Sequence, residues 1–263
     1  MTPSPRTVVV HPDADLLAKA TAARLVTRLV DAQAARGTAS LVLTGGGMGT
    51  AVLAELAKAP ARDAVDWRRL DVWWGDERFL PAGHPERNET GARAALLDHV
   101  AVDPARVHAM PASDGPDGDD VDGAAERYAE ELRASAAALG EHGPVPEFDV
   151  TLVSVGPDTH IASLFPELPA VHEEDRPVVA VRGAPKPPPT RVTLTLPAIQ
   201  ASHEVWVLGS GEAKADAVRL ALGEAGPIQV PAAGAHGRAR TLFLLDRPAA
   251  ARLPAGLAPA GVV

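Results

Sequence analysis

Short apolar runs alternate with helical patterns along this chain, and this alternation constrains the fold more than any other feature. An apolar run, a tight loop and a helix together form the repeating unit of a parallel sheet. Strands are predicted over 7–10, 41–43, 70–74, 148–153, 178–181, 191–196, 205–208 and 241–245, the last closing the sheet. Helices are predicted after Asp13, from about Thr50, and over 88–100, 124–139 and 212–222. We therefore expect an α/β fold: a doubly wound, mostly parallel sheet with helices on both faces, in one domain spanning 1–263.

Charge and composition narrow the classes of partner. The chain has a net charge of -9, which argues against nucleic acid or an anionic membrane, because both bind basic surfaces. Cysteine is absent, so disulfides and thiolate chemistry are excluded. No apolar stretch is long enough to cross a bilayer, and the first residues lack a signal-peptide pattern, so a cytoplasmic location is expected.

A glycine-rich turn, TGGGMGT, separates the strand predicted over 41–43 from the helix that follows. Backbone N–H groups of Gly45, Gly46 and Gly47 could approach an anion there, and a helix N-terminus favours negative charge. The spacing matches neither the dinucleotide fingerprint nor the P-loop, so no nucleotide cofactor is expected and a phosphate monoester fits better. A tight turn that requires positive φ is an equally plausible explanation.

Charged side chains also lie at the ends of other predicted strands and helices. The GDER segment after the strand over 70–74 contains Asp76, Glu77 and Arg78. Arg78 could form a bidentate contact with a phosphate, and a neighbouring carboxylate could orient the Arg78 guanidinium. Arg191 and Lys214 supply further cations. The alternative for these residues is an ordinary solvated surface.

Asp158 and His160 lie two residues apart where the strand over 148–153 ends. Ligands of open α/β sheets bind beyond the carboxyl ends of strands, so this pair is a candidate acid–base site. Histidine titrates near neutrality and can accept a proton from water, and the aspartate can orient the imidazole. A polar loop that caps the next helix is the alternative. Ser163 lacks a nucleophile elbow, and no group of histidines and carboxylates shows metal-ligand spacing.

Several segments together resemble the glucosamine-6-phosphate deaminase/6-phosphogluconolactonase family. They are LTGGGMGT, WWGDERFLP with the Asn88 that follows, FDVTLVSVGPDTHIASLFP, RVTLTLPAIQAS, VLGSGEAKADAV and PIQVPA. The resemblance implies a fold similar to that of the deaminases and of ribose-5-phosphate isomerase, a phosphorylated sugar lactone as substrate, and no metal. The chain departs from the usual family pattern at Thr159, where members mostly have glycine, and at Ile161 and Gln200.

The resemblance also implies roles for individual residues. His160 is similar to the family's catalytic base, with Asp158 as its neighbour. The expected substrate-binding residues are Gly45, Gly46, Gly47, Asp76, Glu77, Arg78, Asn88, Arg191 and Lys214. The implied activity is hydrolysis of 6-phospho-D-glucono-1,5-lactone in the oxidative pentose phosphate pathway. A phosphosugar isomerase or deaminase on the same fold, or a non-catalytic sugar-phosphate sensor, remains an alternative.

Overall fold

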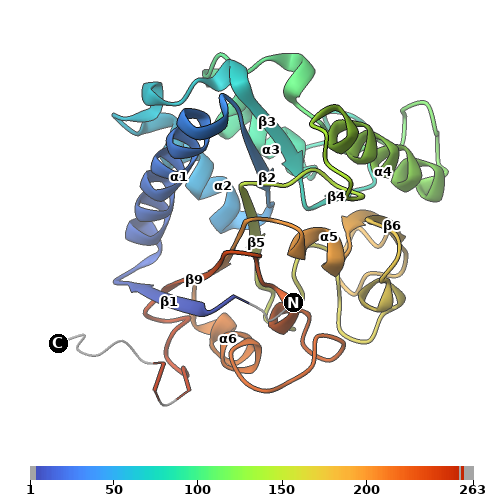
Figure 1. The fold of residues 1–263 in the computed structure, drawn as a ribbon. Helices are drawn as coiled ribbons and strands as arrows, with labels where there is room; N and C mark the ends of the chain where they lie inside the picture. Colours follow the sequence, from blue (N-terminus) through green and yellow to red (C-terminus); the bar gives the residue numbers. More distant parts are fainter. Residues whose placement is uncertain (1–3, 255, 258–263) are drawn as a thin grey trace.

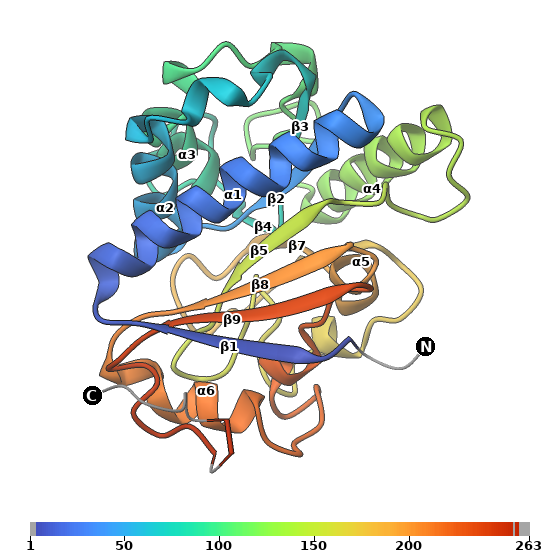
Figure 2. The same cartoon turned by 60° about the vertical axis from the view of Figure 1, so that its left-hand side comes forward.

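A six-stranded parallel sheet forms the centre of the protein (Figures 1 and 2). The computed structural model describes residues 4–254 and 256–257. In spatial order, the strands are β1 (Arg6–His11), β9 (Arg240–Asp246), β8 (Glu204–Gly209), β5 (Val150–Ser154), β2 (Ala39–Leu43) and β3 (Leu70–Trp74). Each neighbouring pair runs parallel. Strands covered on both faces need near-continuous apolar sequence, which is the pattern that predicted them. The expected α/β fold with a mostly parallel sheet is confirmed.

A second, three-stranded antiparallel sheet corrects part of the predicted strand arrangement. Its strands, in spatial order, are β4 (Asp76–Arg78), β7 (Arg191–Leu194) and β6 (Val178–Val181). The GDER segment was expected to be a loop, but it forms β4 because β7, more than a hundred residues later, supplies its hydrogen-bonding partner. The run over 241–245 does not close the main sheet. It forms β9 between β8 and β1, and β1 is the edge strand.

Helices cover both sides of the main sheet. They are α1 (Ala14–Arg36), α2 (Gly46–Lys58), α3 (Asn88–Ala95), α4 (Val121–Ala138), α5 (Leu196–Gln200) and α6 (Ala215–Ala221). In Figure 2, α1 crosses in front of the sheet, and α5 and the small sheet lie behind it. The Asp13 carboxylate caps α1 as predicted, accepting a hydrogen bond from the Leu16 N–H at 2.8 Å. Among the described residues, no helix has the length and apolar character that crossing a membrane requires.

Helix α2 begins four residues earlier than predicted. Its N-cap is Gly45, and Gly46, with φ of +81°, opens the first turn. Glycine adopts that backbone conformation without the steric cost that a side chain would add. The glycines therefore lie at the N-terminus of the helix itself, where unpaired N–H groups point outward.

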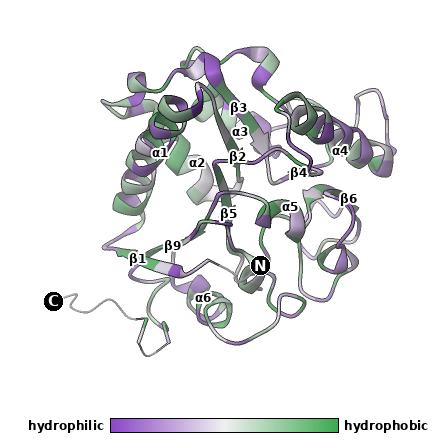
Figure 3. Ribbon diagram, viewed as in Figure 1, coloured by the Kyte–Doolittle hydropathy of each residue, from purple (hydrophilic) through white to green (hydrophobic). Residues whose placement is uncertain are grey.

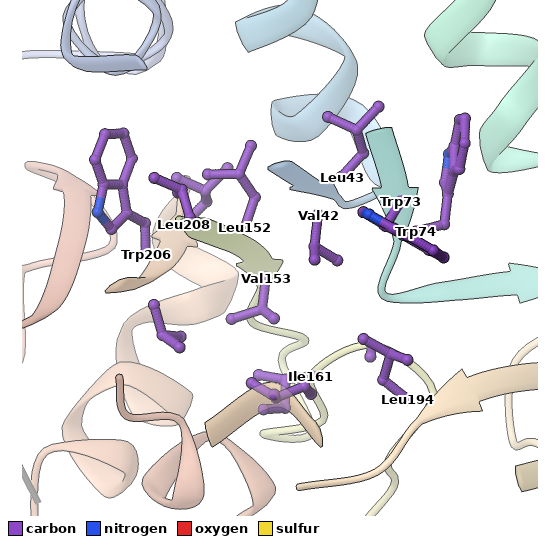
Figure 4. Close-up of a cluster of buried hydrophobic side chains, with 14 of the residues drawn as sticks. Val42, Leu43, Trp73, Trp74, Leu152, Val153, Ile161, Leu194, Trp206 and Leu208 are labelled. Atoms are coloured by element: carbon purple, nitrogen blue, oxygen red, sulfur yellow. The ribbon is translucent and has the colours of Figure 1, made fainter. Parts of the chain in front are cut away.

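Buried side chains of both sheets join in one hydrophobic cluster. Figure 4 shows part of it, with Val42, Trp74 and Leu152 from the main sheet lying near Ile161 and Leu194. Ile161 follows His160 and is fully buried. Burying such a side chain contributes about 1.5–3 kcal/mol, so the loop after β5 is anchored to the core. Hydrophilic and hydrophobic segments alternate along α1, as a helix that covers a core requires (Figure 3).

His108 connects the amino end of β3 to α4. Its ring stacks on Trp73, with 3.7 Å between centroids, and its two nitrogens lie 2.6 Å from Glu131 Oε1 and 3.3 Å from Asp71 Oδ1. Burial tends to lower the pKa of His108, but the hydrogen bonds and charges of the two carboxylates outweigh it and raise the pKa above its ordinary value.

We expect His108→Gln to lower the free energy of unfolding by about 1 kcal/mol at pH 5.5, typical of a partly exposed ion pair, and by less at pH 8.5. A group whose pKa is raised on folding stabilises fully below its unfolded value, and this contribution disappears as pH rises through the folded value. Urea denaturation at both pH values measures the difference. The exposed His172→Gln serves as a control, and a pH-independent loss in His108→Gln would contradict the prediction.

Candidate functional site

Four loops meet at one edge of the main sheet because β8, β5, β2 and β3 are parallel neighbours. The carboxyl ends of parallel strands share an edge, so the segments that follow them lie side by side. These segments contain the glycine turn after β2, GDER after β3, Asp158 and His160 after β5, and Lys214 after β8. The candidate residues that the sequence singled out therefore converge on one rim.

Asp158 and His160 form a hydrogen-bonded pair in a tight loop. The distance from His160 Nδ1 to Asp158 Oδ1 is 2.5 Å. The loop is closed by backbone hydrogen bonds from the Gly156 N–H to the His160 carbonyl and from the Thr159 N–H to the Gly156 carbonyl. The Phe165 ring packs against the imidazole, with 4.6 Å between centroids. Since Nδ1 is directed at the aspartate, Nε2 is the nitrogen left to face a ligand.

Backbone geometry in this loop leaves little freedom. A Cβ on Gly156 would lie 2.0 Å from His160 Nδ1 and 2.4 Å from Asp158 Oδ1, so only glycine lets the pair pack this closely. Thr159 adopts φ of +71°, a backbone conformation that glycine tolerates better than a β-branched residue. Its carbonyl accepts a hydrogen bond from the Ala232 N–H, which helps to hold the strained residue in place.

Lys186, which the sequence analysis missed as a functional residue, completes this cluster. Its Nζ lies 3.1 Å from Asp158 Oδ1 and 3.4 Å from His160 Nδ1. Burial tends to raise the pKa of Asp158, but its interactions with His160 and Lys186 hold that pKa well below its usual range. Asp158 is therefore an anion at neutral pH. The one available signal was that Lys186 is among only four lysines in the chain.

Arg78 and Asn88 lie against the glycine turn. Arg78 Nη1 donates to Asn88 Oδ1 at 2.6 Å, and a Cβ on Gly45 would lie only 1.9 Å from that same oxygen. These residues line a cavity of about 590 Å³ together with Gly46, Gly47 and Pro188. The guanidinium of Arg78 and the N-terminus of α2 thus share one polar cavity that suits an anion.

Asp76 and Glu77 lie beneath this cavity and do not face it. The Glu77 carboxylate, which is 1% exposed, accepts hydrogen bonds from the backbone N–H groups of Arg78, Asn88 and Glu89. Burial raises the pKa of Glu77, although Arg87 and these hydrogen bonds oppose the shift. Asp76 Oδ2 accepts from Ser163 Oγ at 2.6 Å. Internal partners thus occupy both carboxylates, and the expected substrate contacts of Asp76 and Glu77 stay predictions.

Arg191 is likewise buried, with 5% exposure, and its donors are directed at the chain itself. Its Nε donates to the Pro188 carbonyl at 3.1 Å, and its Nη2 donates to the Lys186 carbonyl at 2.9 Å. Burial lowers the pKa of Arg191 below its ordinary value. These hydrogen bonds connect Arg191 to the segment that carries Lys186, and its expected contact with substrate stays a prediction.

Lys214 is the N-cap of α6 and lines a second cavity, of about 650 Å³, with Gly46, Gly47 and Ser210. Burial lowers the pKa of Lys214, and the nearby charge of Lys186 lowers it further, while Asp158 opposes them. The loop before Lys214 is held by Asp246 at the end of β9, which accepts hydrogen bonds from Ser210 Oγ and the Gly211 N–H. The two cavities share Gly46 and Gly47, so cations flank the helix N-terminus on both sides.

Within residues 4–254 and 256–257, no three histidine, aspartate or glutamate side chains cluster in a way that could hold a metal ion. The rim presents an imidazole paired with a carboxylate, three cations, and backbone N–H groups.

Comparisons with known proteins agree with this architecture. The sequence model described as glucosamine-6-phosphate isomerases/6-phosphogluconolactonase matches residues 12–244. The 6-phosphogluconolactonase of Streptomyces coelicolor is 64% identical over 252 residues, which are 96% of each chain. That of Mycobacterium tuberculosis is 54% identical over 247 residues, covering 94% of this chain and 98% of the other.

Solved structures show the same fold. A 6-phosphogluconolactonase from Trypanosoma brucei, at 28% identity, gives a TM-score of 0.79 and covers 95% of this chain and all of its own. A monomeric glucosamine-6-phosphate deaminase, at 20% identity, gives a TM-score of 0.74 over 94% of this chain and 99% of its own, a likeness of fold. The chain therefore belongs to the glucosamine-6-phosphate isomerase/6-phosphogluconolactonase family.

Proposed function

We propose that this chain hydrolyses 6-phospho-D-glucono-1,5-lactone to 6-phospho-D-gluconate, as a cytoplasmic enzyme of the oxidative pentose phosphate pathway. The observation that carries the proposal is the His160–Asp158 pair on the rim that also presents the N-terminus of α2, Arg78 and Lys214. The names of the Streptomyces and Mycobacterium relatives support the substrate.

The phosphate of the substrate binds at the N-terminus of α2. Unpaired N–H groups and the helix dipole favour an anion there, and Arg78 and Lys214 approach from the two flanking cavities. This local concentration of cations is needed because the protein as a whole carries a net charge of -9. Asn88 holds Arg78 in place through the hydrogen bond at 2.6 Å. The proposal requires that the lactone ring extend from this phosphate site to His160, which follows β5 on the same edge of the sheet.

His160 serves first as base and then as acid. Neutral Nε2 takes a proton from water as the water oxygen attacks the C1 carbonyl, which becomes an alkoxide. When the carbonyl reforms, the bond between C1 and the ring oxygen breaks, and the imidazolium returns its proton to that oxygen. Asp158 holds Nδ1 and stabilises the imidazolium between the two steps. Such acid–base assistance contributes about 10²- to 10⁴-fold, and positioning of the substrate adds to it.

Two alternatives from the sequence fit less well. A phosphosugar isomerase or deaminase also needs an acid–base group, but the likeness to a deaminase is one of fold at 20% identity, whereas the relatives at 64% and 54% are lactonases by name. A non-catalytic sensor needs the phosphate site but not the Asp158–His160 pair. Release of ammonia from glucosamine 6-phosphate would favour the deaminase.

We expect His160→Ala to lower kcat by about 10²- to 10⁴-fold while KM changes little, because the imidazole transfers protons and the phosphate contacts stay intact. A coupled assay with freshly generated 6-phosphogluconolactone measures both constants. The exposed His142→Ala controls for loss of a histidine elsewhere. Wild-type turnover in His160→Ala would refute the assigned role.

Gly156→Ala should lower kcat by about a hundredfold, since its Cβ would displace the imidazole and the Asp158 carboxylate from their present positions. Gly223→Ala is the matched control, because a Cβ there meets its nearest atoms at 3.4 and 3.5 Å, an ordinary contact. Circular dichroism and thermal unfolding show whether each variant is folded. Full activity in a folded Gly156→Ala protein would show that the close packing is not needed.

A further inference from the structure

Lys186, Asp158 and His160 form a three-membered charge cluster in which one oxygen has two donors. Lys186 Nζ and His160 Nδ1 both approach Asp158 Oδ1, at 3.1 and 2.5 Å. The ammonium also lies 3.4 Å from Nδ1 itself. A side chain with 40% exposure could extend into water, yet Lys186 is directed at the pair.

Hydrogen bonds fix the backbone segment that carries Lys186. The buried Arg191, at the start of β7, donates to the carbonyls of Lys186, Pro187 and Pro188. The Ala184 N–H donates to the Pro189 carbonyl and closes the same loop. These contacts fix the backbone position from which the Lys186 side chain extends. The ammonium therefore has fewer accessible positions than that of a lysine on a flexible segment.

We propose that Lys186 is a positioning residue that holds Asp158 in line with His160 and disfavours a positive charge on the imidazole. The inference rests on the proposed function, since it assigns a role within that reaction. An ammonium 3.4 Å from Nδ1 repels a positive charge on the imidazole, and this repulsion favours the neutral ring that the proposed reaction uses as its base. The negative charge of Asp158 has the opposite effect. It attracts the imidazolium once that forms, and so offsets part of the repulsion between the imidazolium and Lys186.

Two other cations lie close to this cluster. Lys214 approaches from the start of α6, and its charge interacts with Lys186 and Asp158. Arg191 reaches the face of Phe165, on which His160 packs, with 5.7 Å from its guanidinium carbon to the ring centroid. Among the described residues, Asp158 is the carboxylate hydrogen-bonded to His160. Lys186 is the nearest cation, so its removal should have the largest effect.

The test compares Lys186→Met, which removes the charge at similar length, with Lys186→Arg, which keeps it. We measure kcat/KM between pH 5.5 and 8. In Lys186→Met the midpoint of the acid limb should move about one unit to higher pH, a low-end shift for a charge at this distance in a partly exposed site. Lys186→Arg should keep the wild-type midpoint. Lys58→Met, which removes an exposed charge at the end of α2, should leave the profile unchanged.

A different outcome identifies a different role. If Lys186→Met raises KM and leaves the acid limb in place, Lys186 is a substrate ligand and the inference is overturned. An unchanged profile and unchanged constants also overturn it.

A titration of the resting protein separates this inference from the proposed function. Proton NMR follows the imidazole signal of His160, assigned by its loss in His160→Ala, with no substrate present. Its titration midpoint should lie about one pH unit higher in Lys186→Met than in the wild type. A wild-type protein without lactonase activity would refute the proposed function, whereas an unmoved NMR midpoint would refute the role of Lys186.

Discussion

Parallel pairing of β8, β5, β2 and β3 is the constraint on which the candidate site depends. Each strand ends at the same edge of the sheet, so four loops that are far apart in sequence are brought together without any contact specific to a ligand. The buried side chains on both faces hold this pairing in register. Ile161 extends the same core beneath the loop that carries His160. The precision of the site therefore comes from the packing of the sheet.

Several carboxylates near the rim of this acidic protein are directed inward and hold the segments that carry its cations. Glu77 accepts three backbone N–H groups, Asp76 accepts the Ser163 hydroxyl, and Asp246 holds the loop before Lys214. Each carboxylate organises a segment that presents a cation or a backbone donor. Asp158 is the exception, since it interacts directly with His160. The site thus separates carboxylates that hold the chain from Asp158, for which we propose a part in proton transfer.

At two glycines of the rim, a side chain packs directly against the backbone. Gly45 leaves room for the Asn88 amide, and Gly156 leaves room for the Asp158–His160 pair. Thr159 reaches a positive φ that costs a β-branched residue about 1–3 kcal/mol, and the surrounding hydrogen bonds hold it there. Such strain is tolerated where the neighbouring structure is rigid. It accounts for a loop that departs from the usual family sequence and still places His160 on the rim.

Local patterns predicted the parallel α/β architecture, most strand positions and the candidate residues Asp158, His160 and Arg78, because apolar periodicity and strand-end chemistry can be read from short segments. These patterns did not reveal the antiparallel sheet or the order of β9 and β1, which depend on pairing between distant segments. Only the tertiary structure showed that Arg191 is directed inward and that Lys186 joins the pair at 3.1 Å from Asp158. Hydrogen bonds and charges act through space, so residues 28 positions apart can meet only after the sheet has formed.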